Sequence, residues 1–480
     1  MSTTVPNPRR WLALFIIAIA QFMVIMDTSI IGVALPEIQR AVGLSQSGLS
    51  WVFNAYVIAF GGLLLLGGRL SDLFGARRML MLGFAILSAA SLLAGLATNG
   101  EVLLAGRALQ GLGSALIAPA ALTLLMMLFG HDQGELTKAF AFYGAAAPAG
   151  GTAGVFLGGV LTEWVGWSWV FLINIPVGLA VLAASPGLLP ATAARRGGID
   201  VAGGLSVTAA LSLAVFAIIR APEEGWGSTQ TLLLLAVAVV LLVVFIGLQA
   251  TRTEPLVPLR IFRVPNLAAA NLVMVLLGAA WIPMWFFLNL YLQQVLGYGS
   301  FEAGAALLPM TVTIMVLMIW GTGRLVGRFG FKPTLVTGMV VLATGVGMLG
   351  LVRPDGRFAI DVLSATIVAA TGMSLAYIPA LLAALSGAQP EESGLASGIV
   401  NTTYQIGSAL GLAVMTAVAS AWGAGQLGNR PALTDGFQAA FVGAAAIAGV
   451  GAVLALVWLR QPSATADVEV EIADVVEPAA

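Results

Sequence analysis

The chain contains no cysteine and only one histidine, His131. Without cysteine there is no disulfide bond, thiolate metal site or thiol nucleophile, and a single histidine excludes a histidine-rich metal cluster or a histidine relay. Charge is scarce as well, because 9% of the 480 residues are Asp, Glu, Lys or Arg, whereas a soluble domain carries roughly a quarter. The net charge of −1 argues against nucleic acid as a partner.

Sequence motifs for enzymatic chemistry are also missing. No Walker loop is present, so ATP is not the expected energy source. Paired carboxylates, a nucleophile with its base and a soluble domain are absent too. We therefore predict that the chain is not an enzyme, has no catalytic or metal-binding residues and needs no cofactor.

Long apolar segments dominate the chain instead. Hydrophobic residues make up 59% of the sequence, and the mean hydropathy is +0.99. A bilayer core requires about 20 apolar residues per helix, and the first run, from Trp11, is too long for a signal-peptide core of about 7–15 residues. The sequence thus predicts an all-α membrane protein with fourteen spans, near residues 11–35, 50–68, 77–97, 102–128, 137–162, 167–188, 199–219, 230–250, 267–293, 302–323, 334–352, 361–385, 395–422 and 437–459.

Basic residues indicate how these spans are oriented. Loops on the side of Arg9 and Arg10 carry most of them, and the opposite loops hold only Arg40, Arg220, Arg353, Arg357 and Arg430. Because basic loops remain in the cytoplasm, we predict that both termini are cytoplasmic. The acidic segment 461–480 is predicted to be a disordered cytoplasmic tail.

A loop pattern recurs in the two halves of the chain. Gly68 to Arg78 lies between the second and third spans, and Gly323 to Lys332 lies between the tenth and eleventh. Gly, Arg, Leu, Gly and a base match, while Gly327 stands where the first copy has Asp72. Two parallel repeats on one side of the membrane are typical of transporters built from two six-helix halves, although chance recurrence is the alternative. The predicted division is a first six-helix half in 1–190, two additional helices with linkers in 191–265 and a second six-helix half in 266–460.

Several segments resemble the signatures of a known transporter family. Gly68 to Arg78 resembles the cytoplasmic loop motif of the major facilitator superfamily. Further segments resemble the fourteen-helix drug–proton antiporter branch of that family, in the right order and at the right depths: Asp27 to Pro36, Ser50 to Tyr56, Arg107 to Gly113, Trp167 to Gly178 and Tyr291 to Tyr298. The resemblance implies a major facilitator fold of two six-helix halves with two extra helices between them.

Three positions depart from the pattern of that branch. Gly32 replaces the usual Asn of the first-helix signature, and Tyr404 stands where the family often has Arg. The fifth-helix antiporter motif lacks its usual proline before the glycines; a proline occurs about two turns earlier instead. The residues of this motif helix are Pro148, Gly154, Gly158 and Gly159.

The resemblance also implies a function. It indicates a secondary transporter that exports small amphipathic or hydrophobic compounds, as in drug or antibiotic efflux, by alternating access in the bacterial inner membrane. A proton gradient would be the energy source, the partners would be a small-molecule substrate and the lipid bilayer, and the protein is expected to be a monomer. A metabolite facilitator or proton symporter of the same fold is the alternative.

Two ionisable residues within the predicted spans are candidates for proton coupling. Asp27 is the only acid deep in a span, and Arg107 is the only base within one. Such a group costs about 2.5–3.5 kcal/mol at the helix centre on insertion scales, so a functional role is the default interpretation. Desolvation favours the neutral acid and a guanidinium favours the carboxylate, so movement of Arg107 would switch the proton affinity of Asp27. A static ion pair that fixes helix packing is the alternative.

Polar and aromatic residues within the spans are candidates for the substrate cavity. Because Asp27 is the only deep acid, we expect neutral or monovalent cationic substrates. For the amides the alternative is hydrogen bonding between helices, and for the two tryptophans it is a position facing lipid or the interface. The candidates are Gln21, Asn54, Gln110, Trp281, Trp285, Asn289, Asn401 and Gln405.

The loop after the second span is a candidate cytoplasmic gate. In the fold that the resemblance implies, this loop meets the cytoplasmic start of the helix near residues 395–422, where the carboxylate of Asp72 would be favourable at the helix N-terminus. The bases of the loop are expected to meet Glu391 and Glu392 of the second half and so to latch the outward-open state. A cluster that only sets topology is the alternative. The gate residues are Gly68, Arg69, Asp72, Gly75, Arg77 and Arg78.

Overall fold

The computed structural model describes residues 9–130, 133–191, 200–386 and 393–460. Throughout these residues the regular structure is helical, and fourteen helices are long and apolar enough to cross a membrane. The number of spans predicted from hydropathy is therefore confirmed. The predicted tail 461–480, His131 and the acids Glu391 and Glu392 lie outside the described residues.

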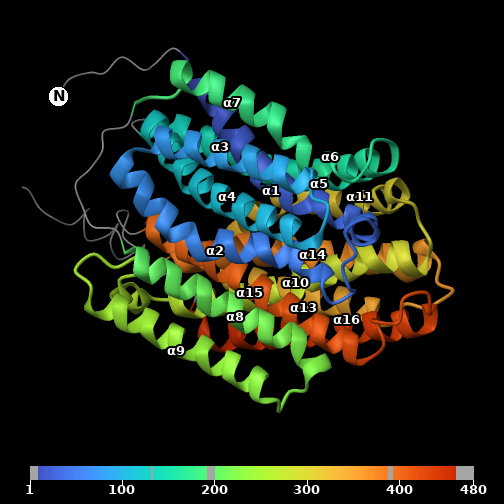
Figure 1. The fold of residues 1–480 in the computed structure, drawn as a ribbon. Helices are drawn as coiled ribbons and strands as arrows, with labels where there is room; N and C mark the ends of the chain where they lie inside the picture. Colours follow the sequence, from blue (N-terminus) through green and yellow to red (C-terminus); the bar gives the residue numbers. More distant parts are fainter. Residues whose placement is uncertain (1–8, 131–132, 192–199, 387–392, 461–480) are drawn as a thin grey trace, which may run out of the picture.

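The helices form two six-span halves with a two-helix hairpin between them in the chain (Figure 1). In Figure 1 the first half includes α3, α4 and α7 in the upper part, and α13 and α16 of the second half lie in the lower part. The first half comprises α1 (Arg10–Val42), α2 (Leu49–Phe74), α3 (Ala76–Gly95), α4 (Gly100–Phe129), α5 (Gln133–Trp164), and α6 (Trp169–Leu172) with α7 (Asn174–Leu188). The hairpin comprises α8 (Val201–Glu224) and α9 (Thr229–Thr251). The second half comprises α10 (Leu267–Leu290), α11 (Ser300–Val316) with α12 (Thr322–Phe329), α13 (Phe331–Leu349), α14 (Leu363–Leu385), α15 (Ser393–Ala421) and α16 (Arg430–Trp458).

The first helix is longer than the hydropathy pattern predicts. α1 continues through Pro36 to Val42, whereas the sequence predicts an end near residue 35. Proline removes one backbone donor from a helix interior, but a helix survives this where the freed carbonyl groups find other donors. The carbonyl of Val33, one turn before Pro36, accepts a hydrogen bond from the side chain of Gln293 at 2.9 Å. A contact with the second half thus accompanies the helix extension.

The hairpin lies against both halves. α8 packs against α2 of the first half and against α15 of the second. α9 is the most exposed of the fourteen spans, because 11% of the residues in its apolar stretch are buried. Asp200 closes the hairpin: this buried carboxylate caps α8 through the amide of Gly203 at 2.9 Å and accepts from Gln249 of α9 at 2.7 Å. Asp200 is a buried acid that the sequence analysis did not single out, because it lies at the end of a span.

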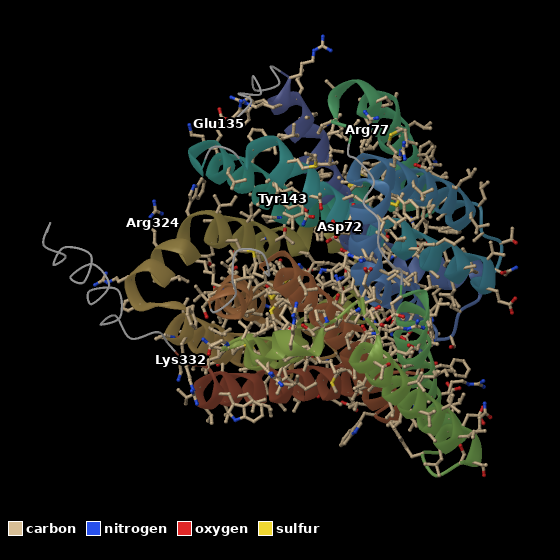
Figure 2. The ribbon with its side chains drawn as sticks, turned by 90° about the vertical axis from the view of Figure 1, so that its left-hand side faces the viewer. Asp72, Arg77, Glu135, Tyr143, Arg324 and Lys332 are labelled. Carbon is tan, nitrogen blue, oxygen red and sulfur yellow. The ribbon has the colours of Figure 1, made fainter. Side chains whose placement is uncertain are left out.

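The two ends of the bundle differ in charge. We call the end that carries Arg10, Arg77 and Lys332 the basic end, and Figure 2 views the molecule from that side. The other end carries the loops with Arg40 and Arg353 and is called the opposite end. Alternation of the helices places the starts of α1, α5, α10 and α15 at the basic end.

Candidate functional site

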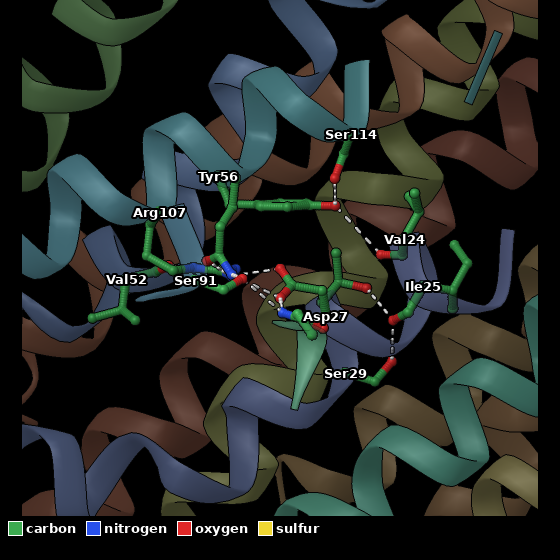
Figure 3. Close-up of polar contacts among 12 residues, drawn as sticks. Val24, Ile25, Asp27, Ser29, Val52, Tyr56, Ser91, Arg107 and Ser114 are labelled. Atoms are coloured by element: carbon green, nitrogen blue, oxygen red, sulfur yellow. Dashed lines mark hydrogen bonds and ion pairs between the residues drawn. The ribbon is translucent and has the colours of Figure 1, made fainter. Parts of the chain in front are cut away.

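Asp27 lies near the middle of α1 and is 1% exposed. Its carboxylate accepts three hydrogen bonds: from Arg107 Nη1 at 2.7 Å, from Asn174 Nδ2 at 2.7 Å and from Gln110 Nε2 at 3.0 Å. The donors come from α4 and α7, so the tertiary contact of three helices creates the site (Figure 3). The buried carboxylate is thus held by one guanidinium and two amide groups.

Arg107 is fully buried on α4 and has acceptors besides Asp27. Its Nε donates to the carbonyl of Val52 at 2.9 Å, and its Nη1 donates to Gln110 at 2.8 Å. The guanidinium also lies over the ring of Tyr56, 4.6 Å from the centroid, an arrangement that attracts a cation. Arg107 therefore keeps favourable contacts that do not depend on the charge of Asp27.

A second layer of polar groups holds these donors in position. Ser91 of α3 accepts from Gln110 at 2.8 Å and from Asn174 at 3.1 Å. The Tyr56 hydroxyl lies 2.8 Å from the Ser114 hydroxyl. The sequence analysis did not single out Asn174, Ser91 or Tyr56; the detectable signal was Asn174 within the apolar Trp167 to Gly178 segment.

The ion pair of Asp27 and Arg107 is thus observed, as expected from the sequence, while its role in coupling stays a prediction. The arrangement has two chemical states. In the charged state the carboxylate holds the guanidinium and two amides; in the protonated state one acceptor weakens, and Arg107 retains Val52, Gln110 and the Tyr56 ring. A proton would therefore change the contacts of α1 with α4 and α7.

The predicted cavity residues fall into three groups. Gln110 belongs to the Asp27 cluster, whereas Asn54 is fully buried and has no hydrogen-bond partner within the described residues. Gln21 and Asn401 are partly buried and bond to tyrosines, Tyr143 at 2.8 Å and Tyr377 at 3.2 Å. The remaining amides pack between helices: Asn289 donates to the carbonyl of Trp285 at 2.8 Å, and Gln405 contacts α2 at Gly61.

The two tryptophans of α10 are buried, at 8% exposure for Trp281 and 6% for Trp285, so neither faces lipid. Trp285 lies against α1, where a Cβ on Gly32 would come within 2.0 Å of its ring. Its ring centroid is 6.2 Å from that of Phe53 on α2. Gly32, which departs from the family signature, therefore provides the space in which the second half contacts the first.

The glycines of α5 bring it close to Asp27's helix. Gly150, Gly154 and Gly158 recur every four residues and face α1, where an added Cβ would lie within 3.0 Å of backbone carbonyl oxygens. Gly159 faces the start of α11, where an added Cβ would lie 2.9 Å from the carbonyl oxygen of Ser300. Tight helix contact is therefore retained although Pro148 lies earlier in the helix than in the usual motif.

Within the described residues, the loop motif at the basic end contacts the segment after α9 and the end of α7. Arg69 pairs with Glu254 of the segment after α9, and Arg77 donates to the carbonyl of Leu189 at 3.2 Å. Arg78 and Asp72 are exposed, and Asp72 has no hydrogen bond or ion pair within the described residues. Gly75 forms the turn with φ 95° and Gly68 packs near Pro119. Since Glu391 and Glu392 are outside the described residues, the latch stays a prediction; Figure 2 labels Asp72 and Arg77.

At the opposite end the halves are joined by contacts between amide side chains and by a hydrogen bond to one carboxylate. Gln294 follows α10 in the π-helical turn Tyr291–Val295 and meets Gln46 at 2.8 Å and Gln39 at 3.3 Å. The carboxylate of Glu163, at the end of α5, accepts from the amide of Ser300 at 3.0 Å. Gln39, Gln294, Glu163 and Ser300 are among the residues that line a hollow of about 580 Å³. The contacts close the opposite end between the two halves.

Comparison with known proteins agrees with this architecture. The family model of the Major Facilitator Superfamily matches residues 17–412. The cephamycin export protein CmcT of Amycolatopsis lactamdurans is 36% identical over 90% of this chain and 89% of its own length. The puromycin resistance protein pur8 of Streptomyces alboniger is 36% identical over 96% and 94%. The multidrug resistance protein Stp of Mycobacterium tuberculosis is 31% identical over 87% and 77%.

Solved structures share the fold at low sequence identity. A nucleoside transporter NupG mutant matches with a TM-score of 0.65 at 14% identity, over 94% of this chain and 100% of its own. A structure of proton dependent oligopeptide transporters matches with a TM-score of 0.65 at 17% identity, over 93% and 98%. The family match and the curated relatives, together with the fourteen spans, identify a multi-pass membrane transporter. The chain belongs to the Major Facilitator Superfamily.

Proposed function

We propose that the protein exports small amphipathic or hydrophobic compounds in exchange for protons, by alternating access. The observation that carries the proposal is the buried pair of Asp27 and Arg107 inside the first half. An ionisable pair deep in a membrane protein is costly, and proton relays are a common reason for one. Relatives whose names describe export or resistance to cephamycin, puromycin and several drugs support the substrate class.

Asp27 is suited to bind and release one proton. Within the described residues it is the only buried acid near the middle of a spanning helix, since Asp200 lies at the start of α8 and Asp361 near the start of its span. Protonation removes the charge that holds Arg107, and the other acceptors of Arg107 keep that base in the first half. The gain or loss of one charge thus repacks α1 against α4, and α1 also contacts the second half through Gly32 and Val33.

The orientation follows from the distribution of basic residues. The basic end is then the cytoplasmic end. Both termini lie on the cytoplasmic side of the bacterial inner membrane, and the closed opposite end faces outward. The described contacts between Gln294, Gln46 and Gln39 then hold the outer side shut. Substrate would reach the protein from the cytoplasm in this state, and opening of the outer side would release substrate and admit a proton to Asp27.

Transport into everted vesicles tests the proposal. Ethidium, a planar aromatic monocation, serves as the substrate, and the vesicle lumen is acidified. We expect uptake with the wild-type protein and none with Asp27→Asn, because Asn keeps the size and the hydrogen bonding of the side chain but cannot change its charge. The matched control is Asp200→Asn, a second buried acid that caps α8, for which proton-driven uptake is expected to continue.

The outcomes separate export from its alternative. A facilitator would equilibrate ethidium without responding to the proton gradient, and a symporter would move it out of acidified everted vesicles. Full proton-driven uptake by Asp27→Asn would contradict the assignment of the coupling residue. Uptake by the wild type that ignores the gradient would contradict proton exchange itself.

A further inference from the structure

Three of the chain's six tyrosines lie at one depth in the bundle. Tyr143 on α5, Tyr377 on α14 and Tyr404 on α15 are each about eight to eleven residues from the basic end of their helix. At 1.5 Å per residue this is roughly 12–17 Å from that end. Gln21 on α1 and Asn401 on α15 lie at about the same depth. The five residues come from both halves, and we call them the tyrosine–amide shell.

The members of the shell contact one another. Within the first half the Tyr143 hydroxyl donates to Gln21 Oε1 at 2.8 Å. Within the second half the Tyr377 hydroxyl donates to Asn401 Oδ1 at 3.2 Å, and the rings of Tyr377 and Tyr404 meet edge to face at 5.4 Å. Tyr143 on α5 belongs to the first half and Tyr377 on α14 to the second, and both lie at a similar distance from the basic end. Figure 2 places Tyr143 near the centre of the basic face.

The residues of the shell are partly exposed and carry no charge. Each of its five residues is partly buried, unlike the fully buried Asp27 cluster. The helix segments 15–24, 139–148, 373–382 and 398–408 that carry it contain no Asp, Glu, Lys or Arg. Asp27 follows Gln21 by six residues on α1, roughly 9 Å along the helix axis. The buried Trp281 and Trp285 of α10 lie closer to the opposite end than the shell does.

We propose that this tyrosine–amide shell is the recognition site for flat aromatic substrates that are uncharged or carry one positive charge; this rests on the proposed function. Phenol rings offer faces for stacking and for a cation, while the two amides and the hydroxyls can exchange their mutual hydrogen bonds for bonds to a ligand. A flat ligand between Tyr143 and Tyr377 contacts both halves at once. Bound substrate therefore bridges the two bodies that must move relative to each other during transport.

Equilibrium binding to the purified full chain in detergent tests the shell without a proton gradient. Ethidium is titrated and its fluorescence increase is followed. Removal of one ring, by Tyr377→Ala or Tyr404→Ala, should weaken binding roughly fivefold to tenfold, as for loss of an aromatic or cation–π contact of about 1–1.4 kcal/mol. Tyr143→Phe, which loses only a hydroxyl, should weaken it roughly twofold to fivefold. Phe142→Ala is the matched control: it removes the neighbouring ring on α5, which is 50% exposed on the outside, and should leave binding unchanged.

Photolabelling keeps the proposal testable if an alanine variant does not fold. Ethidium monoazide reacts with the side chains around it, and the labelled peptides of the wild-type protein should come from the helices of the shell, α1, α5, α14 and α15. Labels confined to other helices, or unchanged ethidium affinity in both folded alanine variants, would overturn the shell. Loss of binding in these variants together with gradient-independent uptake by the wild type would instead support the shell and overturn proton exchange.

Discussion

The two halves share a fold but differ in where they bury charge. The first half carries Asp27 and Arg107 in its interior, surrounded by Gln110, Asn174 and Ser91. Among the described residues of the second half no charged side chain is buried near the middle of a span, because Asp361, whose side chain is 6% exposed, lies at the start of its helix and pairs with Arg353; the inward residues include Trp285, Tyr377 and Asn401. The repeated loop shows the same difference, since Gly327 replaces Asp72. We interpret this as a division of tasks between a proton-binding half and a half that contributes mainly rings and amides to substrate binding.

The largest expected effect tests whether the charges of the first half depend on each other. Arg107→Met leaves Asp27 buried without its cationic partner, which typically costs about 3–5 kcal/mol. We expect a large fall in the thermal unfolding temperature of the purified protein and partial recovery when Asp27→Asn is added. Arg40→Met, at a side chain that is 72% exposed, is the control and should have little effect. An unchanged unfolding temperature in Arg107→Met would mean that the pair is not a stabilising unit.

The second prediction asks whether one buried acid limits the charge of the substrate. Propidium has the phenanthridinium body of ethidium but two positive charges. Each uncompensated charge costs several kcal/mol in a low-dielectric site, and Arg107 already neutralises part of the charge on Asp27. We expect propidium uptake into everted vesicles to be at least about tenfold slower than ethidium uptake. Equal uptake of both dyes, dependent on Asp27 alone, would contradict this charge counting and the contrast between the halves.

The third prediction concerns the amide contacts that join the halves at the opposite end. Gln294→Ala removes contacts with Gln46 and Gln39. At about 0.6 kcal/mol per interhelical hydrogen bond, the ratio of closed to open forms should fall roughly fivefold to tenfold. Cysteines placed at Trp164 and Phe301, whose rings stack at 5.2 Å, report closure by cross-linking in a chain without native cysteine.

The control for this gate is another glutamine at the same end. Gln438 donates to the carbonyl of Val352 within the second half, so Gln438→Ala should leave the cross-linking yield unchanged. A yield that stays the same in Gln294→Ala would exclude the amide contacts as a gate. A yield that falls equally in both variants would point to a general loosening of the second half.

The smallest expected effect concerns the loop that differs between the repeats. Asp72 is exposed while the opposite end is closed, so its predicted contact with the N-terminus of α15 would form in the other state. A carboxylate at a helix N-terminus contributes about 0.3–1 kcal/mol, so Asp72→Asn should raise the ratio of closed to open forms about twofold to fivefold in the same cross-linking assay. Asp355→Asn, an exposed acid of an opposite-end loop, is the control. No change in Asp72→Asn would contradict the latch.

Sequence patterns predicted the features that depend on local composition. Fourteen apolar runs predicted fourteen spans because burial in lipid requires a length that can be counted along the chain. Asp27 and Arg107 were recognisable because a charge within an apolar run is rare. The boundaries were less accurate, as for α1, which continues past Pro36, and α16, which begins at Arg430 rather than near residue 437.

Other parts of the site had no comparable signal in the sequence. A tyrosine or an amide in an apolar helix is common, and its meaning depends on a partner far away in the chain. Tyr143 and Gln21 are separated by 122 residues, and Asn174 and Asp27 by 147. The burial of Asp200 was also hidden, because its partner Gln249 belongs to the next helix.

The sequence by itself determined that the protein spans a membrane, how many times it does so, and where its costly charges lie, because these follow from hydropathy and charge along one dimension. The tertiary structure alone decided which residues meet: that Arg107 faces Asp27, that Trp285 fills the space left by Gly32, and that glutamines join the opposite end. The physical reason is that helix packing depends on the shapes and faces of several helices together. A single glycine or amide acquires its role only when a second helix lies against it.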